Sequence, residues 1–223
     1  MGTLQYTIPL IEYQRFLKTQ EQLQTMPKGH DGKEAGALIA ELGCQLMDQV
    51  FTQLLSQLQA RRSDPFFLSA QQTIQEIQSL LRKYTPWASG LVGNARLLPV
   101  AEHYLGLLSH DPVRGEAILR IALKPDLFQK AERSLQHAAQ ADTGQVHALI
   151  DVLIEVTELC LEHLMEQPKS LLKFNFVADK TLNGVITVTK AMAFKQLRKL
   201  GQVLQADELP LVARHLQQFM HPA

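Results

Sequence analysis

An excess of charge of either sign is absent from this 223-residue chain, and that absence narrows the possible functions. Lys plus Arg number 22 and Asp plus Glu number 22, so the formal net charge is zero. Nucleic-acid binding relies on basic side chains that neutralise phosphates. We therefore expect no nucleic-acid partner, and we interpret the short basic runs at 61–62 and 195–199 as solvated helix surfaces.

Long apolar runs and cysteines are also scarce. No stretch of about 18 uninterrupted apolar residues occurs, so we predict no transmembrane helix and no membrane partner. The first residues lack a basic start followed by an apolar run, which argues against a signal peptide. The two cysteines, Cys44 and Cys160, lie on apolar parts of predicted helices. Buried reduced thiols are typical of cytoplasmic proteins, and a disulfide between them is the less favoured alternative.

Recognisable catalytic motifs are missing as well. The sequence contains no nucleophile-elbow serine, no Cys-x-x-Cys and no Glu-x-x-His, the pattern that ferritin-like metal centres require. A short stretch, Asp111-Pro112 followed by residues 118–122, is similar to a fragment of the HDOD signalling domain, but the rest of the chain does not follow that pattern. We assign no family, expect no cofactor, and lean towards a protein that is not an enzyme.

Two long amphipathic segments are the dominant positive feature. Residues 35–59 and 147–167 each carry polar residues along one helical stripe and apolar residues around more than half of the circumference. In the second segment the stripe is acidic, and it consists of Asp151, Glu155, Glu158, Glu162 and Glu166. We predict two central helices that are buried on most sides, with both polar stripes in solvent.

The similarity between the two central segments extends to their flanks. Residues 4–8 resemble 119–123, residues 70–77 resemble 178–185, and residues 98–103 resemble 209–215, always in the same order. This pattern indicates a tandem duplication. We therefore predict two helical repeats, residues 1–110 and 111–223, that pack as one structural unit.

The predicted fold class is all-α, with about four helices per repeat in a bundle-like body and room for a short strand in each repeat. Residues 174–189 are the ambiguous stretch, because β-branched runs flank Asn183-Gly184, which is typical of a hairpin. Their counterpart in the first half has a helical pattern, so we expect a helix. An α+β fold with a genuine hairpin there is the alternative.

A few residues are candidates for a functional site. His103 and His215 occupy matching repeat positions, and Glu102 adjoins the first; imidazole and carboxylate groups bind first-row metals. The competing interpretation is that these are surface or half-buried histidines near helix C-termini, where a positive charge is mildly favoured. Trp87 lies in a glycine-containing segment, 85–94, which we expect to be a loop whose tryptophan fills the core. Trp87 and Glu102 are candidate ligand-binding residues.

These features support two hypotheses about function. The first is a non-catalytic helical protein that acts by protein–protein interaction or regulation and associates with itself, as a homodimer, or with another protein. The alternative is a small-molecule- or metal-binding protein, or an enzyme, with a site in the cleft between the repeats near Trp87, Glu102, His103 and His215.

Overall fold

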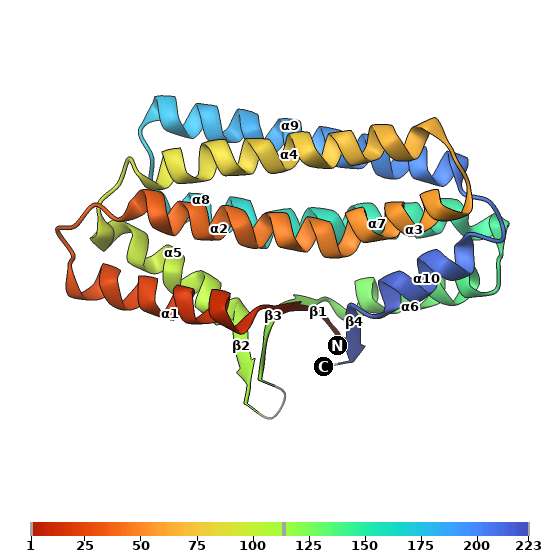
Figure 1. Ribbon diagram of the computed structural model, residues 1–223, viewed down its shortest axis with the longest axis horizontal. Coiled ribbons are helices and arrows are strands. Elements are labelled where there is room, and N and C mark those ends of the chain that lie inside the picture. The colour runs from red at the N-terminus through yellow and green to blue at the C-terminus, as the bar shows by residue number, and fades with distance from the viewer. Residues whose placement is uncertain (1, 113–114, 223) are drawn as a thin grey trace.

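The computed structural model describes residues 2–112 and 115–222 (Figure 1). In this part of the chain most residues are helical, and four short strands form one sheet. The first half contains β1 Gly2–Ile8, α1 Leu10–Thr25, α2 Gly32–Met47, the π-helical η1 Asp48–Thr52, α3 Gln53–Arg61, α4 Pro65–Ser89, α5 Asn94–Leu107 and β2 Leu108–Asp111. The second half contains β3 Glu116–Leu123, α6 Pro125–Ala139, the 3₁₀ turn η2 Thr143–Gln145, α7 Val146–Leu161, the π-helical η3 Glu162–Glu166, α8 Gln167–Leu172, α9 Phe176–Val203, α10 Leu209–Gln217 and β4 Met220–Pro222. The predominantly helical fold class with short strands is confirmed.

The sheet joins the two halves. Its order is β2-β3-β1-β4, and every neighbouring pair is antiparallel. The long central pair runs from Gly2 opposite Leu123 to Ile8 opposite Ala117. Each outer strand pairs with the inner strand of the other half, β2 with β3 and β4 with β1. The predicted repeat boundary after residue 110 falls within β2, and the duplication itself stays a prediction.

Alternation of side chains fixes which face of the sheet is buried. Leu4, Tyr6 and Ile8 of β1 are buried, and Leu119 and Ile121 of β3 lie on the same covered face. A strand with this period of two covers a core on one side only. The same alternation identifies residues 116–123 as a strand.

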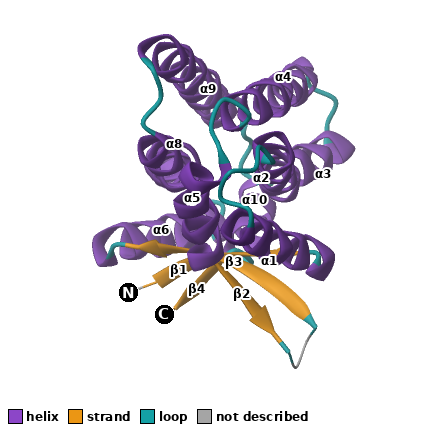
Figure 2. Cartoon of the chain, turned by 90° about the vertical axis from the view of Figure 1, so that its left-hand side faces the viewer, coloured by secondary structure: helices purple, strands orange, loops and turns teal. Residues whose placement is uncertain are grey.

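The helices form two further layers on the covered face of the sheet. Figure 1 shows α4 and α9 farthest from the sheet, with α2–α3 and α7–α8 in a middle layer and α1, α5, α6 and α10 beside the strands. In the view along the helices in Figure 2, α2 and α8 lie on opposite sides below α4 and α9. Both termini lie at the sheet (Figure 1). No described helix is long and apolar enough to cross a membrane.

The two predicted central helices are confirmed, and both are longer than predicted. Helical backbone runs from Gly32 to Arg61 and from Val146 to Leu172, and each run contains a five-residue π-helical segment, η1 and η3. Such segments change the backbone hydrogen-bond register for about one turn. They occupy similar positions in the two runs, past the midpoint of each.

The ambiguous residues 174–189 form the start of α9, so the helix prediction is confirmed and the hairpin alternative is wrong. The side chain of Asn175 caps this helix by accepting a hydrogen bond from the backbone N–H of Ala178 at 3.0 Å. The helix then packs against α4 and α7, and this packing overrides the strand preference of its β-branched residues. Asn183-Gly184 lies inside the helix on an exposed face.

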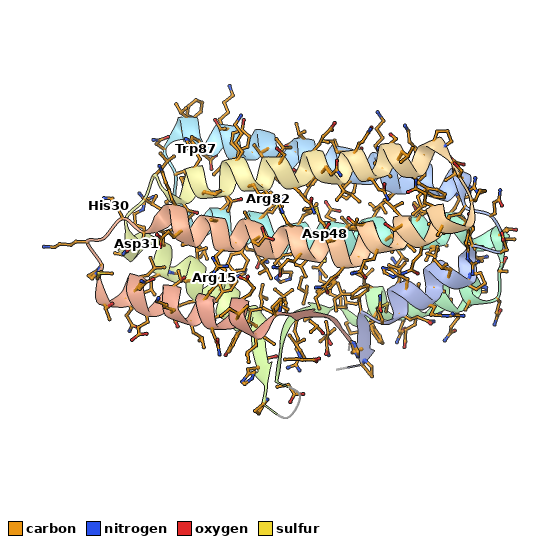
Figure 3. The ribbon with its side chains drawn as sticks, viewed as in Figure 1. Arg15, His30, Asp31, Asp48, Arg82 and Trp87 are labelled. Atoms are coloured by element: carbon orange, nitrogen blue, oxygen red, sulfur yellow. The ribbon has the colours of Figure 1, made fainter. Side chains whose placement is uncertain are left out.

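The segment around Trp87 is a second correction. Residues 85–89 form the last turn of α4, which includes Pro86, and are not a loop. Trp87 is 38% exposed and contacts Tyr84 edge to face, so it does not fill the core. Figure 3 places its side chain at the end of α4, near the start of α9. At this turn α4 lies close to α2, where residue 36 is a glycine that lets the two backbones approach.

Glycines allow close approaches between the middle and outer helices in both halves. A Cβ atom at Gly36 of α2 would lie 2.7 Å from the Cα of Pro86 and 2.7 Å from the carbonyl oxygen of Thr85 in α4. A Cβ atom at Gly201 of α9 would lie 2.5 Å from Cγ1 of Ile150 in α7. Each half therefore has at least one close glycine contact between its central helix and its outer helix.

We predict that Gly36→Ala lowers the free energy of unfolding by about 1–3 kcal/mol, because backbone atoms of α4 must move to admit the methyl group. The matched control is Gly184→Ala in α9, where a Cβ atom meets nothing within 4 Å. That change should stabilise the protein by roughly 0.5–1 kcal/mol through the better helix propensity of alanine. Urea denaturation measures both, and equal effects of the two variants would contradict the close approach.

Candidate functional site

A cavity of about 290 Å³ lies between the two central helix runs. Its roof is formed by α4 and α9, its walls by α2–η1–α3 and α7–η3–α8, and its floor by β1, α5, α6 and α10. Wall residues include Ile39, Leu42, Leu46, Val50, Val152, Val156, Cys160 and Leu164, roof residues include Ile74, Ile77, Leu182 and Ile186, and floor residues include Leu4, Tyr6, Val100, Tyr104 and Leu135. Residues of both halves line it, and nearly all of them are apolar.

The cavity corrects the prediction that both central helices are buried on most sides, because the second run is buried mainly at its two ends. Leu149, Ile150 and Val152 are buried near its start and Leu172 at its end. Between these ends, Val156 and Leu164 line the cavity and are only half-buried, although both also pack against the hydrophobic core. The acidic stripe on the outer face is in solvent, as predicted, with Glu166 half-buried.

The cavity is partly open to solvent and is not a void sealed in the core. The protein's own side chains do not fill this volume, which falls at the lower end of ligand-pocket sizes.

The ionisable groups at the cavity wall and floor are neutral at pH 7. The Tyr104 hydroxyl donates to the carbonyl of Leu164 at 2.6 Å, and the Tyr6 hydroxyl lies 3.9 Å from Sγ of Cys160. Burial raises the pKa of both tyrosines above the ordinary value and raises the pKa of Cys160 to about 11. The thiol is therefore protonated, and a protonated thiol is a poor nucleophile.

Charged groups lie at the rim. Lys169 is the one charged residue in the described lining, and its Nζ is 2.5 Å from a carboxylate oxygen of Asp179. Lys190 pairs with Glu166 at 2.6 Å and with Glu158 at 3.4 Å on the outer face of the second central run. Hydrogen bonding to Glu166 is the main cause of the raised pKa of Lys190. The cavity interior is thus apolar, and its nearest charges are paired.

The two candidate metal ligands have structural hydrogen bonds. Nε2 of His103 lies 2.7 Å from the carbonyl oxygen of His163 in η3, and Nε2 of His215 lies 2.9 Å from the carbonyl oxygen of Val50 in η1. Since a carbonyl only accepts, each Nε2 carries the proton and donates. In both cases a histidine from one half satisfies a carbonyl in the π-helical segment of the other half.

His215 has no ring nitrogen left for a metal, because its Nδ1 lies 3.3 Å from the side-chain amide of Gln218. Glu102 is exposed, and neither it nor Trp87, His103 or His215 lines the cavity. Within residues 2–112 and 115–222, no three His, Cys, Asp or Glu side chains lie close enough together to hold a metal ion. The structure therefore does not assemble these four residues into one site.

Comparisons with protein-family models, with curated proteins and with solved structures found no match to this chain. The cavity was missed in the sequence because an apolar side chain facing a cavity and one packed in a core look identical in a pattern. One signal was available: both central segments are apolar around more than half of their circumference, which is more surface than two neighbouring helices cover.

The two cysteines offer a test of the cavity environment, and no disulfide links them. With its pKa raised to about 11, Cys160 has a thiolate fraction on the order of 0.1% at pH 8. We predict that iodoacetamide alkylates Cys160 on the order of a hundred times more slowly than an ordinary cysteine.

The alkylation rate should rise about tenfold per pH unit between pH 7 and pH 10, because the raised pKa keeps the thiol protonated throughout this window. Peptide mass spectrometry follows Cys160 separately from Cys44, whose pKa burial also raises to about 11. The urea-unfolded protein is the control and should react at the ordinary rate. A plateau near pH 9 in the folded protein would contradict the buried environment.

Proposed function

We propose that this protein is a non-catalytic carrier or sensor that binds one elongated apolar molecule in the cavity between its two halves. The observation that carries this proposal is the cavity of about 290 Å³ with its almost wholly apolar lining. Apolar cavities half this size, about 150 Å³, already bind small hydrocarbons in other proteins. Transfer of an apolar molecule from water into such a lining supplies the binding free energy.

The distribution of lining residues supports an elongated ligand. Along α4 they extend from Phe66 to Ser89, and along α9 from Leu182 to Leu200. At 1.5 Å per residue, the α4 portion alone corresponds to roughly 35 Å. A narrow space of this length matches a long hydrocarbon chain better than a compact ring system.

We predict that Ala193→Phe weakens binding of the neutral apolar probe N-phenylnaphthylamine by at least roughly tenfold, because Ala193 lines the cavity and the new ring occupies its volume. Fluorescence titration measures the dissociation constant. The matched control is Ala191→Phe, an exposed position on the same helix, which should leave binding unchanged.

Val156→Phe in α7, a wall of the cavity, provides a second cavity-filling variant. With two variants, a folding defect in one of them does not determine the conclusion about binding. Circular dichroism checks that both variants fold. If the wild-type protein binds no apolar probe, or if both cavity variants bind as tightly as the Ala191→Phe control, the proposal is wrong.

A second observation favours the interaction hypothesis. Phe176 and Val177, at the start of α9, are 79% and 70% exposed, and Leu171 at the end of α8 is 42% exposed. Large apolar side chains clustered on a surface in this way are typical of protein–protein contacts. We propose, as the alternative, that this cluster mediates self-association as a homodimer or binding to another protein.

The double variant Phe176→Ser, Val177→Ser should abolish concentration-dependent self-association in sedimentation velocity, because it removes the two most exposed apolar side chains of the cluster. The cap residue Asn175 is retained, so the helix start should persist. Ile11→Ser is the control, because Ile11 is also exposed, at 61%, but lies on α1 and outside this cluster. A wild-type protein that stays monomeric at every concentration would refute self-association.

We also propose that the chain arose by internal duplication, and that it is cytoplasmic. Matching strand pairs support the duplication: Leu108 pairs with Leu119, and Met220 pairs with Leu4, which are corresponding pairs if residues 4–8 correspond to 119–123. The exchanged contacts of His103 and His215 with η3 and η1 follow the same correspondence. The free thiols support the reducing location.

A further inference from the structure

Among the polar side chains that interrupt the apolar lining in the roof of the cavity, formed by α4 and α9, are Thr73, Thr189 and Gln196. Nε2 of Gln196 donates to the Thr73 hydroxyl at 2.7 Å, and that hydroxyl donates to the carbonyl of Ser69 at 3.0 Å. A hydroxyl has one proton, so Thr73 must accept from Gln196. The orientation of the Gln196 amide is thereby fixed, and its Oε1 is the atom left over.

Two of these polar atoms are buried without a hydrogen-bond partner in the described part of the chain: Oε1 of Gln196 and Oγ1 of Thr189. Thr189 is 2% exposed. Its hydroxyl differs from those of Thr25, Thr73 and Thr181, which bond to the carbonyl four residues earlier in their helices. Oε1 of Gln45 is also buried without a partner, but Gln45 does not line the cavity. Buried polar atoms are nearly always satisfied in folded proteins, so the two roof atoms are candidates for a hydrogen bond to a bound molecule.

The two unpartnered atoms lie on the same side of α9. Thr189 precedes Gln196 by two helical turns, so their side chains share one face and are about 10 Å apart along the axis. Both residues line the cavity. The roof therefore offers an acceptor at Gln196 and a hydroxyl, able to donate or accept, at Thr189.

The electrostatics of the roof exclude a charged partner. Lys169, the one charged residue of the described lining, is already paired with Asp179. A carboxylate next to Gln196 would lose its hydration without gaining a cation, and it would face another acceptor oxygen. An ammonium group would also lose its hydration without a counter-ion. Gln196 Oε1 requires a neutral donor.

We propose that the ligand is a long-chain apolar molecule with a neutral hydrogen-bond-donating headgroup, a hydroxyl or a primary amide, held by Gln196 and Thr189. This inference rests on the proposed function, since it names the ligand class of the same cavity. The headgroup O–H or N–H donates to Oε1 of Gln196 while the hydrocarbon chain contacts the apolar walls. Thr189 provides a second contact for a ligand that carries another polar group along its chain.

The test compares four probes of equal chain length: dodecanol, dodecanamide, dodecanoic acid and dodecane. Displacement of N-phenylnaphthylamine at neutral pH gives the affinity of each for the whole protein. We expect dodecanol and dodecanamide to bind roughly fivefold more tightly than dodecane, the value of one net hydrogen bond. Ionised dodecanoic acid should bind more weakly than either.

Gln196→Leu removes the acceptor and keeps the volume, so it should reduce the affinity for dodecanol roughly fivefold and leave dodecane unchanged. Thr189→Val is nearly isosteric and tests the second contact in the same way. The control Thr187→Val makes the same change on an exposed position of α9 and should change neither affinity.

Three outcomes would overturn the inference. Equal binding of dodecanol and dodecane, unaffected by Gln196→Leu, would show that the roof polar atoms bind only water. Tightest binding of dodecanoic acid, lost in Lys169→Met, would place an anionic headgroup at the rim. Failure of the reporter itself to bind would refute the cavity as a ligand site, a result distinct from a failure of headgroup selectivity alone.

Discussion

The antiparallel pairing of β1 with β3 is the constraint on which the rest of the structure depends. It fixes the first strand of one half against the first strand of the other, and the outer strands then add to the opposite inner strands. Each of the three strand pairs in the sheet therefore joins a strand of the first half to a strand of the second half. The helices that follow β1 and β3 start from this shared sheet. Both central runs lie on its covered face, with α2 and α8 on opposite sides in Figure 2.

On the covered face of this sheet, helix packing determines which regions are close-packed and where the cavity lies. Each central run touches its outer helix closely at one end, through Gly36 in the first half and Gly201 in the second. Each is also tied to the other half by a histidine, His103 or His215, that donates to a carbonyl in a π-helical segment. The inward faces of the two runs, held in this way, line the cavity with apolar side chains and do not close upon each other.

The chemistry of the interior follows from the same arrangement. Burial keeps Tyr6, Tyr104 and Cys160 neutral, and the acidic stripe of the second central run faces outward, where Lys130 and Lys190 pair with it. An interior of this kind favours binding of an apolar molecule over acid–base or nucleophilic chemistry. The polar atoms of the roof are few and neutral, so they select among apolar ligands by hydrogen bonding and not by charge.

The sequence by itself determined the helical class, the two central helices and their solvated polar stripes, because amphipathic periodicity is a local property of the chain. It also favoured a helix over a hairpin at 174–189 through comparison between the halves. Only the tertiary structure decided that residues 116–123 are a strand, that Trp87 lies outside the core and that His103 and His215 bond to carbonyls, since each depends on partners distant in sequence. The cavity belongs to the same group, because an apolar residue has the same pattern whether its neighbour is a side chain or a ligand.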